Sequence, residues 1–575
     1  MVVGRWREDE VTWVAAGPRR IAVLGCAAAD PRILTAALRR AHDVADLDGL
    51  LRSLPGSFHM VAAVDGTVRV QGSVSTACQI FHARLGPVTV AANRPDVLAR
   101  LTGAGIAVEV LTLQMLAPAV PYPLNETPVW DGVRALPFGT CLELTAGRAR
   151  ERQWWTPPAP EIPLAECADR VRSVLSEAVA ARTRAGGTVS ADLSGGLDST
   201  SVCFLMAAHA AGPGAPRMVT LHQESLNAGN DDLGWARHAA EAMPDAEHLV
   251  LPDKEVPPMF TGLSEPDSDA EAPLFRTHVR AMIRHSAQVL AAQGSTVHLT
   301  GDGGDELYFA DPAFLHTLAR RHPWSWIRKM RADRSLNRWT LTATLREIAR
   351  NRPYGRWLAA CADTLTDPLP KPSRNPEIEW DSTVRMPPWA TPAAVEAARS
   401  LIRGAAQAAP MSPLRCSHVA LRGLRKGGEA VRRTGRITEA HGISWQAPFL
   451  DDRVIEAALS IRLEDTSAVD GYKPSLTAIM RGTMPDSLLA RRTKAEFSQA
   501  AYLGLHENLD ELLGLCDDLR LAALDLVDAD AFRAALLALY PSSMGLTVLL
   551  RTLACEVWLR SLPATAAASP IGGTA

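Results

Sequence analysis

The chain of 575 residues lacks the signals of several protein classes. Its 60 Lys and Arg residues against 63 Asp and Glu residues leave no basic excess, which argues against a general nucleic-acid binder. The first ten residues open with charge and have no apolar core, so no signal peptide is indicated. No apolar run reaches the length of a membrane span. We therefore expect a soluble cytoplasmic protein that binds neither nucleic acid nor a membrane.

The nine cysteines are widely scattered, and no two form a Cys-x-x-Cys pair. This spacing argues against a zinc ribbon or a thioredoxin-type site and favours reduced thiols in the core. Hydrophobic residues make up 47% and charged residues 21% of the chain, as in ordinary globular proteins. At roughly 100–200 residues per domain, the length predicts more than one domain.

A proline-rich stretch at residues 156–163 separates two parts that differ in their sequence pattern. In residues 1–155, short apolar runs are broken by Gly, Pro, Asn and Asp. Asp65-Gly66 between two such runs is a typical hairpin signal. We predict a β-rich antiparallel domain here, with a few helices such as Pro31–Ala41.

Beyond the prolines, predicted strands at Val189–Leu193, Arg217–His222 and Thr296–Thr300 alternate with predicted helices, which indicates a parallel sheet. The helices are expected at Leu164–Ala185, Ser199–Ala211 and Leu233–Ala242. From about residue 312 to residue 562 the pattern is mostly helical, and the tail 563–575 is small, polar and expected to be disordered. The predicted fold class is α/β + α+β, with domains at 1–155 and 164–562 joined by the linker 156–163.

The hexapeptide Ser194-Gly195-Gly196-Leu197-Asp198-Ser199 lies where a predicted strand turns into a predicted helix. Its glycines permit a tight turn close to a ligand, and the unpaired N–H groups at the helix start suit a pyrophosphate. The two serine hydroxyls add donors, and Asp198 can hold a Mg²⁺ ion that bridges phosphate oxygens. No Gly-Lys-Ser/Thr follows, so this is not a P-loop; a plain structural turn is the alternative.

A second loop, Gly301-Asp302-Gly303-Gly304-Asp305-Glu306, follows the strand at Thr296–Thr300. Its three carboxylates repel one another, and Mg²⁺ with ATP phosphates would relieve that repulsion. Alone, the loop could be a solvated acidic turn. Because ligands of open α/β sheets bind beyond the carboxyl ends of the strands, two such loops in one sheet predict a nucleotide site.

In this order the two loops resemble those of the asparagine synthetase family, in the superfamily of PP-loop ATP pyrophosphatases (adenine-nucleotide alpha hydrolases). The resemblance runs from about Leu164 to Phe497 and includes three further motifs. These are Asn230-Asp231-Asp232-Leu233-Gly234-Trp235-Ala236, Ala447-Pro448-Phe449-Leu450-Asp451, and a closing stretch from Lys473 through Arg491-Arg492-Thr493-Lys494.

The resemblance implies ATP and Mg²⁺ as cofactors. It places the metal at Asp198 and Asp305. The nucleotide contacts implied are Leu193, Ser194, Gly195, Gly196, Leu197, Asp198, Ser199, Leu221, Gly301, Gly303 and Gly304.

Three residues receive catalytic roles by the same resemblance. Lys494 would stabilise charge as an acyl-adenylate collapses, and Lys473 would lie near the phosphates. Where asparagine synthetases have Glu and β-lactam synthetases have Tyr, this chain has Asp302, which we expect to act as a base for the attacking amine or to contact the substrate. The stretch Ser444-Trp445-Gln446-Ala447 lacks charges that the family shows there, which indicates a substrate pocket unlike that for free aspartate.

The N-terminal part resembles the N-terminal nucleophile (Ntn) glutaminase domain of the same family, at Leu54-Pro55-Gly56-Ser57-Phe58 and from Thr127 to Trp155. That family attacks glutamine with a cysteine at position 2, whereas this chain has Val2, and its first cysteine is Cys26. The resemblance therefore implies a degenerate domain without glutaminase activity, kept as a structural remnant or a docking surface.

Family members without this cysteine typically join a carboxylate and an amine of one molecule. Our first hypothesis is a lasso peptide cyclase, which would adenylate an Asp or Glu side chain of a precursor core peptide and close a macrolactam with its N-terminal amine. A leader peptidase and a leader-binding protein would be its partners. The alternatives are a small-molecule amide ligase, either an ammonia-dependent asparagine synthetase or a β-lactam-forming relative, and a non-catalytic scaffold.

An arginine-rich stretch from Arg415 to Arg436 has no assigned role. It could attract an acidic peptide, but such charge runs more often form a solvated helix face.

Overall fold

The computed structural model describes the chain apart from residues 1, 5, 211–213, 226, 228, 267–268, 369–374, 467–471, 493–497, 541–542 and 564–575. The predicted tail therefore falls almost wholly outside the described residues.

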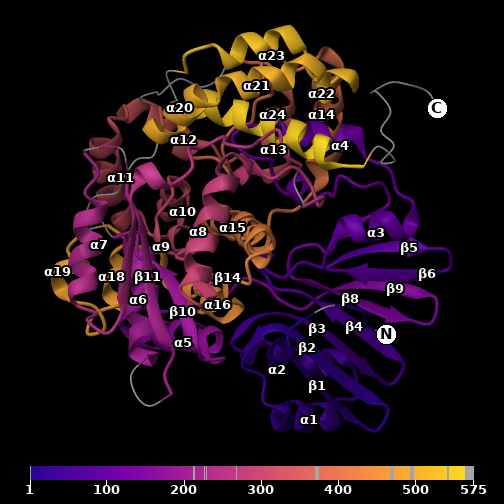
Figure 1. Cartoon of the computed structure of the whole chain (residues 1–575), viewed down its shortest axis with the longest axis vertical. Helices are drawn as coiled ribbons and strands as arrows, with labels where there is room; N and C mark the ends of the chain where they lie inside the picture. Colours follow the sequence, from indigo (N-terminus) through magenta and orange to yellow (C-terminus); the bar gives the residue numbers. More distant parts are fainter. Residues whose placement is uncertain are drawn as a thin grey trace.

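The N-terminal part is built from nine described strands in two antiparallel sheets (Figure 1). The strands are β1 (Val11–Ala16), β2 (Arg19–Ala27), β3 (Gly56–Val64), β4 (Thr67–Gln71), β5 (Phe81–Leu85), β6 (Val88–Ala92), β7 (Arg134–Ala135), β8 (Thr140–Thr145) and β9 (Arg148–Gln153). The larger sheet has the order β1-β2-β3-β4-β8-β9, and the smaller one β6-β5-β7. Asp65 and Gly66 join β3 to β4 with φ of 46° and 88°, the left-handed turn that the Asp-Gly pair predicts.

A five-stranded parallel sheet forms the centre of the second part. Its strands are β10 (Thr188–Asp192), β11 (Arg217–Gln223), β12 (Glu247–Leu251), β13 (Ser295–Leu299) and β14 (Ser444–Gln446), in the order β12-β11-β10-β13-β14. Every neighbouring pair in this order is parallel. The predicted α/β class is thus confirmed, and so are three of its strands; β12 and β14 were not predicted.

Helices cover both faces of the parallel sheet, so most residues of its central strands β10, β11 and β13 are buried. On one face, Val189 and Ala191 pack with α5 (Leu164–Thr183) and α6 (Leu197–His209). On the other, Val219 and Leu221 pack with α8 (Arg280–Ala292). The helix after the first loop begins at Leu197, two residues before the predicted start, so Asp198 lies in the first turn of α6.

The remaining helices are the small helices of the N-terminal part, α7 between β11 and β12, and a large helical region after β13 (Figure 1). They are α1 (Pro31–Arg40), α2 (Asp48–Ser53), α3 (Pro95–Thr102), α4 (Val108–Gln114), α7 (Asp232–Glu241), α9 (Gly304–Tyr308), α10 (Ala313–Arg321), α11 (Pro323–Asn337), α12 (Leu341–Ala349), α13 (Tyr354–Asp363), α14 (Pro392–Gly404), α15 (Arg415–Glu439), α16 (Asp452–Leu459), α17 (Leu463–Thr466), α18 (Pro474–Ile479), α19 (Asp486–Leu489), α20 (Ser498–Glu507), α21 (Leu509–Leu515), α22 (Arg520–Ala523), α23 (Ala529–Leu536) and α24 (Ser543–Ser561). Among the described residues, no helix has both the length and the apolar character needed to cross a membrane.

The N-terminal part is joined to the second part by buried polar contacts. The Gly56 N–H donates to an Asp451 carboxylate oxygen at 2.5 Å, and the Thr76 hydroxyl donates to the Arg425 carbonyl at 2.6 Å. The proline-rich stretch is also held, because the Ile162 N–H donates to the Ser460 carbonyl at 3.0 Å. The boundaries proposed at 155/156 and 163/164 remain predictions.

Candidate active site

The two predicted loops meet at the switch point of the parallel sheet. From β10 the chain continues outward through β11 and β12, whereas β13 lies on the opposite side of β10. Ligands of open α/β sheets bind at such points. A Cβ atom added to Gly304 would lie 2.5 Å from Cγ of Asp198, so the acidic loop packs directly on the first turn of α6.

The first loop has the local geometry of a phosphate cradle. Gly195 has a φ of +84°, and a Cβ there would lie 2.6 Å from the Asp232 carbonyl oxygen. The hydroxyls of Ser194 and Ser199 lie 2.7 Å apart, and the Gly196 N–H points at Ser194 Oγ from 3.3 Å. These donors gather at the start of the 13-residue helix α6, where N–H groups lack helical partners and favour an anion.

Lys473 connects the two loops. Its fully buried ammonium forms ion pairs with Asp198 and, at 2.7 Å, with Asp305. Lys473 itself has a φ of 50°, a left-handed conformation that a non-glycine residue rarely adopts. The structure therefore brings together the predicted residues Asp198, Asp305 and Lys473.

These carboxylates fit a metal that arrives with its nucleotide. Among the described residues, no group of three or more His, Cys, Asp and Glu side chains could hold a metal ion. Mg²⁺ is commonly held by one or two carboxylates together with substrate phosphates. Asp198 and Asp305 supply two carboxylates beside the phosphate cradle, so the donor set suits Mg²⁺ with ATP.

Asp302 lies at the opposite side of the acidic loop and is held by two neighbours. Its carboxylate pairs with Arg276 at 3.0 Å and accepts a hydrogen bond from the Thr300 hydroxyl at 3.0 Å. The Asp302 charge raises the pKa of Arg276 above its ordinary value. Gly303 follows with φ of +98°, and a Cβ there would clash with Leu450 of the Pro-Phe-Leu-Asp motif at 2.8 Å.

The acidic motif that opens α7 is tied to the closing basic stretch. Arg491, which is buried, pairs with Asp232 and, at 3.1 Å, with Asp231.

The two predicted leucines of the nucleotide site lie at the carboxyl ends of adjacent strands, because the Leu193 N–H donates to the Leu221 carbonyl at 2.7 Å. Lys494, the third predicted catalytic residue, lies outside the described residues.

A cavity of about 490 Å³ extends from the acidic loop toward the N-terminal part. Its size is that of a small-molecule or peptide pocket. Five separate regions of the sequence supply its walls: residues 76–135, residues 271–279, the acidic loop, α15 and α24. Asp302, Gly303 and Glu306 form the wall nearest the nucleotide loops.

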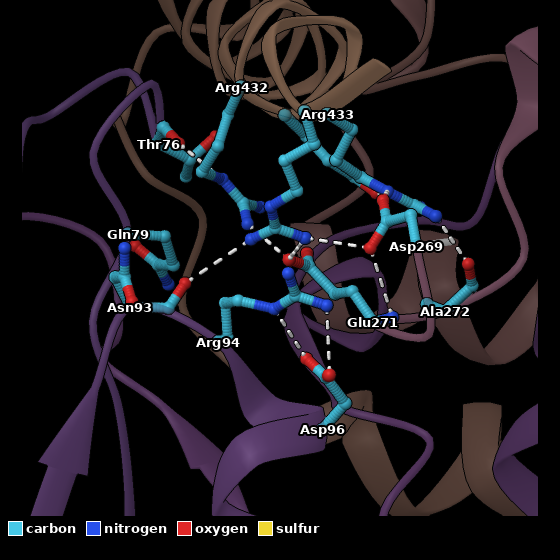
Figure 2. Close-up of polar contacts among 12 residues, drawn as sticks. Thr76, Gln79, Asn93, Arg94, Asp96, Asp269, Glu271, Ala272, Arg432 and Arg433 are labelled. Atoms are coloured by element: carbon cyan, nitrogen blue, oxygen red, sulfur yellow. Dashed lines mark hydrogen bonds and ion pairs between the residues drawn. The ribbon is translucent and has the colours of Figure 1, made fainter. Parts of the chain in front are cut away.

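The arginine-rich stretch is a structural helix, and its interpretation as a solvated face is wrong. Arg433 on α15 is buried and pairs with Asp269 at 2.7 Å, while Arg432 pairs with Glu271 at 2.5 Å (Figure 2). Arg425 pairs with Glu126 of the N-terminal part. The charges therefore fix the segment that leads to Arg276, and the acids that neutralise them lie far away in the sequence.

The altered stretch Ser444-Trp445-Gln446 forms strand β14 at the edge of the sheet. The Trp445 ring lies 4.3 Å from the His298 ring, and Trp445 is absent from the described walls of the large cavity. Its expected contribution to a substrate pocket is thus not found there. Arg276, Glu306 and Lys426 line that cavity instead; Arg276 and Lys426 belong to no motif, and Glu306 had no role assigned.

The three cysteines of the N-terminal part are poor nucleophiles. Burial raises the pKa of the Cys26 and Cys141 thiols and brings that of Cys78 to about 12. A thiol with a raised pKa is protonated and unreactive near neutral pH. All nine cysteines of the chain are free thiols, and eight of them are buried.

A parallel α/β sheet with glycine-rich and acidic loops at its switch point defines a nucleotide-binding α/β protein. Comparison with known proteins identifies the family. Residues 170–560 match the family model described as asparagine synthase. This match covers more than half of the chain, so the chain belongs to the asparagine synthase family. Membership supports an ATP-dependent carbon–nitrogen ligase.

Similar curated proteins are putative glutamine-hydrolysing asparagine synthetases of Mycobacterium bovis and Mycobacterium tuberculosis. Each is 28% identical over 317 residues, which cover 50% of this chain and 42% of the relative. The match thus spans less than half the length of these relatives.

Solved structures with a detectable likeness include a glutamine phosphoribosylpyrophosphate amidotransferase from B. subtilis with ADP and GMP, and an allosteric regulatory enzyme of purine biosynthesis. The former has a TM-score of 0.19 at 11% identity and covers 44% of this chain and 65% of its own. The allosteric regulatory enzyme has a TM-score of 0.18 at 10% identity, and the match covers 43% of this chain and 62% of the enzyme's chain.

Proposed function

We propose that this chain is an ATP-dependent, AMP-forming ligase that joins a carboxylate and an amine of one peptide, as in macrolactam formation in a lasso peptide precursor. A substrate carboxylate attacks the α-phosphate of ATP, which forms an acyl-adenylate and releases pyrophosphate. The substrate amine then displaces AMP, and one proton is released as the amide forms.

The observation that carries the ligase activity is the meeting of Asp198, Asp305 and Lys473 between two loops at the sheet switch point. The N–H groups around Gly196 would bind the pyrophosphate, and the two aspartates would hold Mg²⁺, which supplies positive charge to the phosphates. Lys473 would hold the two loops together through its ion pairs with Asp198 and Asp305. For Lys494 we propose the stabilisation of charge at the adenylate.

Two observations support a substrate that carries its own amine. The cysteines of the N-terminal part have raised thiol pKa values and offer no reactive thiolate for releasing ammonia from glutamine. The cavity beside Asp302 has about 490 Å³ and includes apolar walls, for example Phe81 and Phe275, which favour a peptide over free aspartate. Asp302 would act there as the base or as a substrate contact. A leader peptidase and a leader-binding protein remain proposed partners, and the cytoplasm the proposed location.

The test measures AMP release with ATP and Mg²⁺ in two arms. One arm contains free aspartate and ammonia, and the other contains synthetic peptides with a free N-terminal amine and one Asp or Glu at varied positions. We expect AMP together with a peptide lighter by one water. Asparagine formation without peptide turnover would instead support the small-molecule ligase. Asp198→Asn and Asp305→Asn should abolish AMP release, and full activity in both would refute the metal assignment.

A further inference from the structure

Most charged side chains that line the large cavity already have partners. Arg276 pairs with Asp302 at 3.0 Å, Arg425 with Glu126, and Arg432 with Glu271 at 2.5 Å. The same holds for the remaining arginines and for Glu429. Arg422 pairs with Asp381 at 2.6 Å, Glu429 with Arg433 at 3.3 Å, and Arg551 donates to the Pro118 carbonyl at 3.1 Å. These contacts lie within the protein, and all except that of Arg551 pair opposite charges.

Glu306 and Lys426 differ from the ion-paired residues of the cavity, and Lys426 also differs from Arg551, whose guanidinium donates to a backbone carbonyl. Within the described residues, Glu306 and Lys426 line the cavity and neither enters an ion pair. Lys426 is exposed to the cavity, and its ammonium lies over the Phe275 ring at 5.4 Å. Glu306 lies against the same helix, because a Cβ on Gly423, one turn before Lys426, would approach Glu306 Cγ to 2.6 Å.

The surroundings of both side chains favour a ligand of opposite charge. Glu306 has no ion-pair partner among the described residues, so a substrate ammonium would supply one. The protein around Lys426 partly desolvates its ammonium where it faces the cavity, and together with Arg551 and Arg422 nearby this lowers the pKa of Lys426 to about 8. A substrate carboxylate would offset that cost.

We propose that Glu306 and Lys426 bind the two reacting groups of the substrate, Glu306 its ammonium and Lys426 its carboxylate. Glu306 lies in the acidic loop, so an amine bound there stays near the site where the adenylate forms. The proposal rests on the proposed function, since it assigns the two ends of a substrate that carries both groups. It predicts a specificity for peptides with a free amine and a free carboxyl side chain.

The first test combines protein variants with altered peptides. In the wild-type protein, N-acetylation of the peptide should raise the KM for carboxylate-dependent ATP–pyrophosphate exchange about ten- to a hundredfold, as expected for loss of a charged hydrogen bond. In Glu306→Gln the same N-acetylation should have no further effect. Lys426→Met should raise the KM for the free peptide by a similar factor, and Lys426→Arg should restore most of it.

Glu429→Gln is the matched control, because Glu429 lines the same cavity but is already paired with Arg433. Its KM should stay within about twofold of the wild-type value. If N-acetylation costs the same factor in Glu306→Gln as in the wild type, the ammonium assignment is wrong. If Lys426→Met keeps the wild-type KM, the carboxylate assignment is wrong.

The second test needs no turnover. The chain has only six lysines, so limited acetylation with sulfo-NHS-acetate at pH 8 can be followed at each by mass spectrometry. Lys426 should react much faster than the buried, ion-paired Lys473, and carboxylate-bearing peptides should protect it. Protection without turnover would refute the proposed ligase but keep the binding assignment. Turnover of peptides that leave Lys426 unprotected would refute the binding assignment alone.

Discussion

Replacing Lys473 with methionine removes the ammonium that lies between Asp198 and Asp305. Methionine keeps the length and the buried apolar stem of the lysine, so the variant tests the charge. Coulomb's law with an effective dielectric constant of about 20 gives about 6 kcal/mol of attraction at the 2.7 Å separation from Asp305. Desolvation of the buried ammonium cancels much of this energy.

The net cost follows from the burial of the three side chains. Breaking a buried ion pair usually costs about 3–5 kcal/mol. Asp198 and Asp305 keep 20% and 46% of their side-chain exposure, so solvent screens part of the repulsion left behind. We therefore expect a loss of about 3 kcal/mol in the free energy of unfolding for Lys473→Met in the absence of metal.

Two assays measure the result. Thermal unfolding should show a lower melting temperature, and MgCl₂ should raise it more in the variant than in the wild type, because the metal supplies the missing charge. Carboxylate-dependent ATP–pyrophosphate exchange should fall about 10²–10³-fold, the usual effect of losing one preorganised charge at a reacting centre.

Lys329→Met provides the comparison, since Lys329 forms an equally short, mostly buried pair with Asp333 on α11, at 2.7 Å. This variant should lose stability without any change in exchange rate and without a special response to Mg²⁺. The reasoning is refuted if Lys473→Met keeps the wild-type exchange rate, or if both variants respond to Mg²⁺ in the same way.

Three further changes have predictable outcomes. Gly304→Ala should abolish exchange, because the methyl would enter the space of the first loop, whereas Gly234→Ala, with open space around its Cβ, should retain it. Burial lowers the pKa of His418 to about 3, so below pH 6.5 only the unfolded chain takes up the proton. The free energy of unfolding therefore falls by about 1.4 kcal/mol per pH unit as the pH falls below 6.5. Between pH 6.5 and 5.0, the free energy of unfolding measured by urea titration should fall by about 2 kcal/mol less in His418→Gln than in the wild type. Equal losses in the two proteins would contradict this. Arg433→Met should lower the free energy of unfolding by about 3 kcal/mol, because it breaks a buried ion pair. Arg403→Met breaks an exposed pair and should lower it by less than about 1 kcal/mol. Equal urea midpoints for the two variants would contradict this difference.

The part of the site that the sequence predicts is the part made by local motifs. The cradle of the first loop depends on two glycines, two serines and a helix start that are contiguous in the chain. The meeting of Asp198 with Asp305 could also be predicted, because a parallel sheet collects the ends of its strands at one edge. In both cases the information lies within a few residues of the functional atoms.

The cavity could not be predicted in the same way, because its walls come from regions far apart in the sequence. Arg276 lies 26 residues before its partner Asp302 in a segment without a motif. Among the acids that neutralise α15 are Asp269 and Glu271 from another segment, and Glu126 from the N-terminal part. A charge pattern along one helix cannot reveal partners more than 150 residues away, so it predicts a solvated helix where the structure has a buried, ion-paired one.

This arrangement also gives the β-rich N-terminal part a structural role at the cavity. A Cβ on Gly428 of α15 would lie 1.7 Å from the Ser75 carbonyl oxygen, so the two parts approach to backbone contact. Thr76 and Phe81 line the cavity from the same side, and Glu126 neutralises Arg425. Loss of these residues would open the cavity to solvent and leave a buried guanidinium without its carboxylate, which is costly. The N-terminal part therefore forms one wall of the cavity.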